Sequence, residues 1–355
     1  MRIMHSSRLL RMRRHAMAVT ASLALVAVAV SGCSSRETPR SSGTSRAPLN
    51  MTAGSDSSVA ASSRVLFGGD AQLSGLRDLG RSPAIVRTYD TIDNAGNFPT
   101  KDENSALRSG ATLLTSLGTG RHRDWASIAA GKSDTAVLKF LRAVNKAAAD
   151  HHLKAIYVSF NHEPNAKINA NKGRPENFVA AWRHVHKLAA DAHLDAEVGG
   201  HLRWVWILTA SGFRKSSIAN SFWPGAKYVD VVGADGYVSG GCTKQKSGNY
   251  VNPAKNAPQP GAIFGPALTW STTHATSKPV FIPEWGSVRF TDRSVRPSYI
   301  HAMTDYVVAH PQIDAILYWN DHAHYSSCDY ALDKDPSSQR ALTAMGRNSH
   351  FQAHR

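Results

Sequence analysis

The sequence lacks the short motifs that mark several common enzyme classes. It has no Gly-x-Ser-x-Gly elbow, which excludes the usual serine nucleophile of α/β-hydrolases, and it has no phosphate-binding loop. Phe67-Gly68-Gly69-Asp70, at the end of the first expected strand, is not the Gly-rich turn that a dinucleotide-binding fold places there. Serine-elbow hydrolysis and nucleotide chemistry are therefore not what this sequence predicts.

A concentrated basic segment is also missing. The formal net charge is +15, but outside the N-terminal leader no dense block of Lys or Arg appears. Charge spread along the chain, without a recognisable nucleic-acid module, does not indicate a nucleic-acid partner, and we predict none. An acidic partner such as a polyanionic envelope is the alternative explanation of the charge.

No apolar run in the N-terminal segment is long enough for a comfortable membrane span, yet this segment has the pattern of an export signal. Five arginines precede the apolar run Ala16–Val30, and small residues follow it. Val30-Ser31-Gly32-Cys33 resembles a bacterial lipobox, in which the cysteine becomes the lipidated N-terminus. We therefore predict a signal peptide at residues 1–32 and an exported protein, anchored to the cell membrane by lipid on Cys33 and facing outside. Ordinary cleavage with a free thiol at Cys33 is the alternative.

Large apolar residues are almost absent from residues 33–63, which are rich in Ser, Thr, Gly, Arg and Pro. Such a segment cannot bury a core, and it predicts a flexible linker. The chain has three cysteines, and the two outside the leader, Cys242 and Cys328, lie in expected loops at one end of the fold. In an exported protein they are a candidate disulfide. A zinc site formed by Cys328 together with Asp321, His322 and His324 is the alternative.

Residues 64–350 alternate short apolar runs with helical patterns, which is typical of βα units around a parallel sheet. Several runs are continuously apolar, as expected for strands covered on both faces. The eight expected strands lie near Val65–Phe67, Ala84–Arg87, Ala111–Ser116, Ala155–Phe160, Arg203–Leu208, Tyr228–Gly233, Val280–Pro283 and Ile313–Trp319.

Helical periodicity connects these strands. Apolar residues recur every three or four positions over Ser133–Asp150 and Pro175–Leu194, and a third helix is expected over Pro297–His310. Eight strands in fewer than 300 residues predict a (β/α)8 TIM barrel of the α/β class. An open doubly wound sheet is the rival, but it would normally carry the phosphate-binding turn that is missing here.

Two glutamates follow buried strands. Glu163 closely follows the fourth expected strand, in Asn161-His162-Glu163-Pro164, and Glu284 follows the seventh, in Pro283-Glu284-Trp285-Gly286. A TIM barrel places its chemistry at the carboxyl ends of its strands, and the fourth and seventh strands lie nearly opposite each other. Two carboxylates that face each other across a sugar ring are the minimum equipment for cleaving a glycosidic bond. A structural ion pair is the alternative.

These two motifs look like those of clan A of the glycoside hydrolases. One further segment narrows the resemblance to a single family. The segment Phe222-Trp223-Pro224-Gly225-Ala226-Lys227-Tyr228-Val229-Asp230-Val231-Val232-Gly233-Ala234-Asp235-Gly236-Tyr237 closely resembles glycoside hydrolase family 26, the β-mannanase family. The resemblance covers most of Arg64–Asn348.

The resemblance implies catalytic roles for both glutamates. Glu163 would be the general acid/base and Glu284 the nucleophile of a retaining enzyme. The chemistry asks for a raised pKa at Glu163, and it asks for hydrogen-bond donors at Glu284. It also implies that Tyr237 hydrogen-bonds the nucleophile and that His162 and Trp319 bind the sugar. Asn161 and Tyr237 are also counted as substrate-binding residues, as is Trp206, for which a core position is the alternative. Arg87 and Asp90 are added as residues that line the mouth. We expect no cofactor and no metal ion.

This chain departs from the family pattern beside the acid/base. Tryptophans usually follow that glutamate, but residues 165–172 contain none, and strand five ends in Leu208-Thr209-Ala210 where Ser-Pro-Asn is usual. The expected function is retaining hydrolysis of a β-linked polysaccharide by a monomer, with a β-1,4-mannan-like polymer as the expected substrate. The alternatives are a cell-surface carbohydrate-binding barrel without catalysis, and the same chemistry on β-xylan, β-glucan or an envelope glycan.

Overall fold

The computed structural model describes residues 65–73, 79–239, 241–246, 250–322 and 328–352. The predicted signal peptide, the linker and Cys33 lie outside these residues, so their predictions stay untested. In the part of the chain that is described, no helix is both long and apolar enough to cross a membrane.

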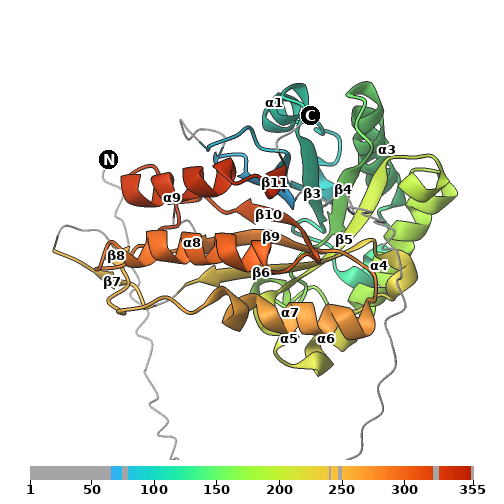
Figure 1. The fold of residues 1–355 in the computed structure, drawn as a ribbon. Coiled ribbons are helices and arrows are strands. Elements are labelled where there is room, and N and C mark those ends of the chain that lie inside the picture. Colours follow the sequence, from blue (N-terminus) through green and yellow to red (C-terminus); the bar gives the residue numbers. More distant parts are fainter. Residues whose placement is uncertain (1–64, 74–78, 240, 247–249, 323–327, 353–355) are drawn as a thin grey trace, which may run out of the picture. The chain divides into compact units, whose positions relative to one another are not determined.

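Eight parallel strands of the described chain form a closed barrel (Figure 1). Neighbours along the chain pair in order, and the last barrel strand pairs with the first, with Leu66 opposite Ala315. The predicted TIM barrel is therefore confirmed. The barrel strands are β1 (Val65–Asp70), β2 (Ile85–Thr91), β3 (Thr112–Gly118), β4 (Ile156–Phe160), β5 (Leu202–Thr209), β6 (Val231–Val238), β9 (Val280–Ser287) and β10 (Ile313–Tyr318).

Helices cover the outside of the barrel. Figure 1 shows α7, α8 and α9 over the outer face of β6, β9 and β10, with α3 and α4 near β4 and β5. The α-helices are α1 (Lys101–Arg108), α2 (Trp125–Ala129), α3 (Asp134–Asp150), α4 (Pro175–Asp191), α5 (Ala210–Phe213), α6 (Ser216–Phe222), α7 (Pro260–His274), α8 (Val295–Val308) and α9 (Pro336–Arg347).

Side chains of the strands divide between two apolar layers, because successive residues of a strand point to opposite faces. The inner layer fills the barrel, with members such as Val205 and Ile207 of β5. The outer layer packs between strands and helices, and it includes Trp206 of the same strand. This alternation decides which strand residues can reach the mouth of the barrel.

The structure extends the expected elements and adds others. Strand β6 begins at Val231 because Ala226–Tyr228 forms a 3-10 helix, so the expected start at Tyr228 was too early. Helix α8 begins at Val295, which places Pro297 in its first turn, where proline is tolerated. The short strands β7 (Thr243–Lys244) and β8 (Tyr250–Val251) form a hairpin, and β11 (Phe351–Gln352) pairs with β1.

The two cysteines expected to pair are bonded to each other. Cys242 follows β6 and Cys328 follows β10, and their sulfur atoms are 2.02 Å apart with a Cα–Cα distance of 5.7 Å. Two loops at the carboxyl end of the barrel are thereby joined.

Candidate active site

Two glutamates meet at the carboxyl end of the barrel. Glu163 follows β4 and Glu284 lies in β9, far apart in the sequence, but one carboxylate oxygen of each lies within 4.8 Å of the other. Asp235 of β6 brings a third carboxylate within the same distance. The predicted convergence of the two glutamates is what the fold produces.

The segment that carries Glu163 has an unusual backbone. Asn161 and Glu163 have positive φ angles of 45° and 50°, a left-handed conformation that is uncommon for residues other than glycine. The amide of Asn161 donates to the carbonyl of Leu117 (2.9 Å), and that of Glu163 donates to the carbonyl of Ile207 (2.9 Å). These bonds to β3 and β5 hold the strained turn, and such strain clusters at functional sites.

The carboxyl group of Glu163 is held in an environment that favours its neutral form. Burial, then the nearby charge of Glu284, raise the pKa of Glu163 to about 8, against the opposing charge of Arg87. Among the described residues none donates a side-chain hydrogen bond to this carboxyl. A protonated acid at neutral pH is what a general acid requires.

The carboxylate of Glu284 has the opposite environment. Tyr89 donates a hydrogen bond to Oε1 (2.6 Å) and Tyr237 donates one to Oε2 (2.5 Å). The guanidinium of Arg87 lies 3.3 Å from Oε1. Hydrogen bonds and an adjacent positive charge both favour the ionised form of a carboxylate.

Arg87 is fixed beneath the two glutamates. It is almost fully buried (1% exposed), and Nη2 donates to the Ser116 hydroxyl at 2.8 Å while Nη1 donates to the Leu114 carbonyl at 3.2 Å. Its guanidinium carbon lies 4.3 Å from the centre of the Tyr89 ring. A buried arginine held this firmly supplies a constant positive charge beside Glu284.

His162 lies beside both glutamates and stays neutral. Burial, with the charge of Arg87 adding to it, lowers the pKa of His162 to about 4, although Glu284 opposes the shift. Its Nε2 is 4.0 Å from Glu284 Oε1, and its ring centre is 5.3 Å from that of Tyr89. A neutral imidazole here offers a polar contact without adding charge to the site.

Asp235 was not singled out from the sequence, although it stands two residues before Tyr237. Residues i and i+2 of a strand point to the same side, so the position of Tyr237 also placed Asp235 toward the mouth. Burial, and then the charges of Glu284 and Glu163, raise the pKa of Asp235 well above its ordinary value. The raised pKa favours a protonated Asp235, which avoids a second negative charge beside that of Glu284.

Tyr89 was also missed, for the same reason. It lies two residues after Arg87 on β2, so both side chains point to the site. Asp90 had been expected there instead, which is wrong. Asp90 accepts a hydrogen bond from Thr115 (3.1 Å) and lies against Glu103 of α1, on the helix side of the strand.

Of the two tryptophans expected in the site, one lies there. Trp319 follows β10, is half-buried, and contacts the Tyr89 ring edge-on at 5.6 Å between ring centres. Trp206 is fully buried, donates to the carbonyl of Phe222 (3.0 Å) and packs against Trp223 and Trp270. Its assignment to substrate binding was wrong, because Trp206 belongs to the outer layer of β5. Asn161 is buried at the end of β4.

The three carboxyl groups also form a conceivable metal site, but the charges around them disfavour one. Arg87 already stands 3.3 Å from Glu284, where it would repel a cation. The raised pKa values of Glu163 and Asp235 favour protonated acids, which are poor metal ligands. The arrangement is better suited to holding and transferring protons.

Part of the chain matches a known family. Residues 166–267 match the model of glycosyl hydrolase family 26. This match includes the stretch from Trp223 to Tyr237 but contains neither Glu163 nor Glu284, so the arrangement of the glutamates is an independent observation. No curated protein matches the chain in sequence.

Solved structures share the barrel at low sequence identity. The GH26 endo-β-1,4-mannanase catalytic domain of Bacillus sp. JAMB-750 has a TM-score of 0.57 at 15% identity, over 82% of this chain and 87% of that one. GH26C of Muricauda sp. MAR_2010_75 has a TM-score of 0.58 at 13% identity, over 82% and 88%. The endo-β-1,4-mannanase of Cellulomonas fimi has a TM-score of 0.55 at 17% identity, over 82% and 72%. At these identities the likeness establishes the fold.

Proposed function

We propose that the protein is a retaining glycoside hydrolase of the family 26 type, acting on a β-linked polysaccharide. The observation that carries this proposal is the contrast between the environments of two carboxyl groups, each of which has one oxygen within 4.8 Å of the other group. Glu163 is kept protonated, while Glu284 receives two tyrosine hydroxyls and an arginine. Retaining enzymes place their carboxyl groups about 5–5.5 Å apart, whereas inverting enzymes need about 6.5–9.5 Å.

The first chemical step uses both groups. A carboxylate oxygen of Glu284 attacks the anomeric carbon while Glu163 gives its proton to the glycosidic oxygen, so the bond between sugar and leaving group breaks and a glycosyl ester of Glu284 forms. Tyr89, Tyr237 and Arg87 hold the carboxylate of Glu284 in a fixed orientation for this attack. Fixed geometry lowers the barrier because little ordering remains to be done.

The second step requires Glu163 to act as a base, and the same electrostatics provide for it. The charge of Glu284 is the second cause of the raised pKa of Glu163. Once Glu284 is an ester, that charge is gone and the pKa of Glu163 falls. Glu163 then takes a proton from water, the hydroxyl attacks the anomeric carbon, and Glu284 leaves as a carboxylate.

Contacts to the sugar are assigned to the residues around this pair. Trp319 and Tyr89 present aromatic surface that can pack against the C–H face of a pyranose. The neutral His162 and the buried Asn161 offer polar contacts next to Glu163. We assign these residues to the sugar that is cleaved.

The substrate we propose is a β-1,4-mannan-like polymer. The family match over residues 166–267 and the names of two structural neighbours, both endo-β-1,4-mannanases, support this choice. The absence of tryptophan from residues 165–172 motivates two rivals: the same chemistry on β-xylan, β-glucan or an envelope glycan, and a barrel that binds carbohydrate without cleaving it.

The direct test is a glycan panel with NMR analysis of the anomeric configuration of the first products. We expect retention on one class of β-glycan, loss of activity in Glu163→Ala and Glu284→Ala, and partial rescue of Glu163→Ala by azide as a β-glycosyl azide. The control is Lys187→Ala, at an exposed ion pair with Asp191 on α4. Inverted products, or full activity in either glutamate variant, would contradict the proposal. Binding without any product would favour the binding barrel.

We also propose export and attachment to the membrane through Cys33. The support is the sequence of the leader together with the Cys242–Cys328 disulfide, a bond typical of oxidising compartments. Fatty-acid labelling of the full chain in a bacterial host should label the wild type and not Cys33→Ala. Equal labelling of both would reject the anchor.

A further inference from the structure

A cavity outside the candidate active site is lined by positively charged side chains that are separated in the sequence. It has a volume of about 270 Å³, and its lining includes Arg289, Arg293, Arg296 and Lys334. Asp335 is the one acidic residue among the described residues that line it. Four cations facing a single carboxylate create a positive potential, and a concave surface strengthens it.

Most of this charge is uncompensated. Arg289, Arg293 and Lys334 form no ion pair within 4.0 Å in the part of the chain that is described. Asp335 is already engaged, because it accepts hydrogen bonds from Ser337 (2.9 Å) and Ser338 (2.7 Å) and lies 3.5 Å from Arg296 Nη1. Cations held together without counter-charges repel each other, so an anion in this cavity relieves that repulsion.

Unused hydrogen-bond donors point to the same kind of ligand. Nε and Nη2 of Arg289 and Nε of Arg296 are buried without a hydrogen-bond partner among the described residues, and Arg296 is only 1% exposed. Leaving such donors unpaired is costly. Nε and Nη2 form one edge of a guanidinium, which matches two oxygens of a carboxylate, sulfate or phosphate.

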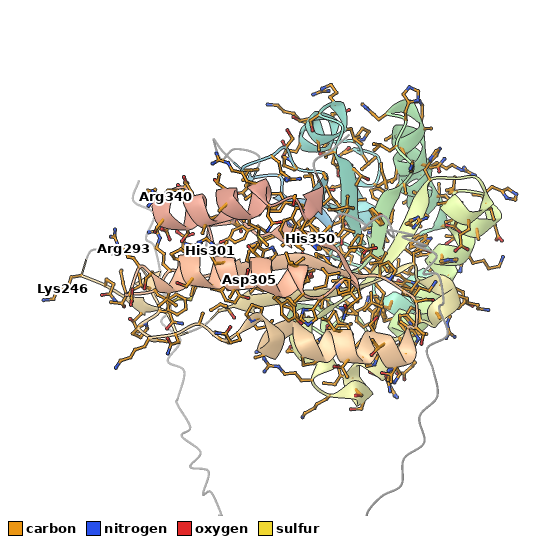
Figure 2. All side chains as sticks on the ribbon, viewed as in Figure 1. Lys246, Arg293, His301, Asp305, Arg340 and His350 are labelled. Atoms are coloured by element: carbon orange, nitrogen blue, oxygen red, sulfur yellow. A yellow bond between two sulfur atoms is a disulfide. The ribbon has the colours of Figure 1, made fainter. Side chains whose placement is uncertain are left out.

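Two helices begin at the cavity and add to its polarity. Helix α8 starts at Val295, between Arg293 and Arg296, and α9 starts at Pro336, directly after Lys334 and Asp335. Each helix contributes a partial positive charge at its N-terminus. Figure 2 shows Arg293 at the start of α8, at the same end of the structure as Lys246 of the β7–β8 connection.

Tyr330 links the cavity to the candidate active site. The carbonyl of Tyr330 accepts a hydrogen bond from Arg296, and its ring packs against that of Tyr237 with 5.2 Å between ring centres. Tyr237 in turn donates to Glu284. Both sites therefore lie at the carboxyl end of the barrel.

We propose that this cavity is an anion-binding site that takes one phosphate, sulfate or carboxylate group. Arg289 supplies the paired donors, Arg293 and Lys334 supply charge at the exposed rim, and Arg296 forms the buried wall. The group can come from a free anion or from an acidic substituent on a glycan chain held at the barrel mouth. The second source rests on the proposed hydrolase function, whereas the site itself does not.

The first arm of the test measures binding without catalysis. Titration of the folded protein with inorganic phosphate and with glucuronate, followed by NMR or calorimetry, should detect binding of at least one. Arg289→Gln and Lys334→Gln should each weaken it about tenfold or more. Arg340→Gln is the matched control, because Arg340 is an exposed arginine of α9 that does not line this cavity (Figure 2). No binding by the wild type, or equal weakening in Arg340→Gln, would overturn the site.

The second arm separates the two sources. It uses one neutral β-glycan that the protein hydrolyses and the same polymer with part of its C6 hydroxyls oxidised to carboxylates. A higher KM for Arg289→Gln on the oxidised polymer only, with kcat retained, supports a glycan substituent as the source. An unchanged KM on both polymers, with phosphate binding lost, supports a free anion. If no polymer is cleaved, the hydrolase proposal fails and the first arm still decides the site.

Discussion

The ends of β4 and β9 show how one fold gives two identical side chains opposite properties. At the end of β4, Glu163 stands on a left-handed backbone with no side-chain donor among the described residues, and its pKa rises to about 8. In β9, Glu284 lies where the register of the strand shifts against both β6 and β10, and its carboxylate receives Tyr89, Tyr237 and Arg87. The difference lies in the neighbouring strands, because β2 and β6 supply every one of those donors. The placement of hydrogen-bond donors thus gives the two carboxyl groups the different environments that the proposed acid and nucleophile require.

The strongest way to break this contrast is Glu284→Gln. Hydrolysis should fall below detection because no nucleophile remains, and the pKa of Glu163 should fall because the charge of Glu284 helps to raise it. Carbon-13 NMR of labelled glutamate side chains measures this pKa. An unchanged pKa of Glu163 would show that the two groups are not coupled.

Arg87→Met removes the positive charge beside Glu284. It leaves the buried carboxylate of Glu284 without its cation, and removing one partner of a buried pair typically costs about 3–5 kcal/mol. We expect kcat/KM to drop by about 10²–10³-fold, with a lower midpoint of thermal unfolding. Both are compared with Arg183→Met, which removes an arginine on α4 that bonds the carbonyl of Pro224. Wild-type activity in Arg87→Met would show that its charge is dispensable.

The hydrogen bonds from Tyr89 and Tyr237 to Glu284 can be tested with a matched pair of variants. Tyr89→Phe and Tyr237→Phe each remove one hydrogen bond to Glu284 while keeping the ring. A hydrogen bond to a charged group contributes about 1.5–3 kcal/mol, so kcat should fall about 10- to 100-fold in each variant. The loss should appear in kcat more than in KM, since the carboxylate is misoriented and not removed. A change in KM alone would assign these tyrosines to substrate binding.

The smallest expected effect is on stability against pH. In the folded protein Glu163 keeps its proton up to about pH 8, whereas the unfolded chain releases it near its ordinary value of 4.5. Stability from this group therefore falls as pH rises through that window. The glutamine of Glu163→Gln does not titrate. As pH rises from 5 to 8, the thermal unfolding midpoint of this variant should therefore increase relative to that of the wild type. Parallel curves for both proteins would contradict the raised pKa.

Sequence patterns were sufficient for the barrel and for the strand ends that carry Glu163 and Glu284. Continuous apolar runs mark strands covered on both faces, and the order of strands in a closed barrel then places the fourth opposite the seventh. What the patterns left open was the face of each strand. Trp206 and Asp90 were assigned to the mouth, although both point outward.

The alternation of side chains along a strand predicts Tyr89 and Asp235 as further residues of the site. Arg87 and Tyr89 share one face of β2, and Asp235 and Tyr237 share one face of β6. If one residue of each pair points into the barrel mouth, the residue two positions away on the same strand points there too. Pairing of the β7–β8 hairpin and the gathering of four cations around one cavity depend on tertiary contacts between distant segments, for which a single sequence carries no comparable signal.

Trapping the covalent intermediate tests the central claim most directly. With the sugar identified from the glycan panel, a matched 2-fluoro glycosyl fluoride should stall the second step, and peptide mass spectrometry should locate the label. The account predicts one sugar per protein, attached to Glu284, and none in Glu284→Gln. A label on another residue, or unhindered turnover with inverted products, would contradict it.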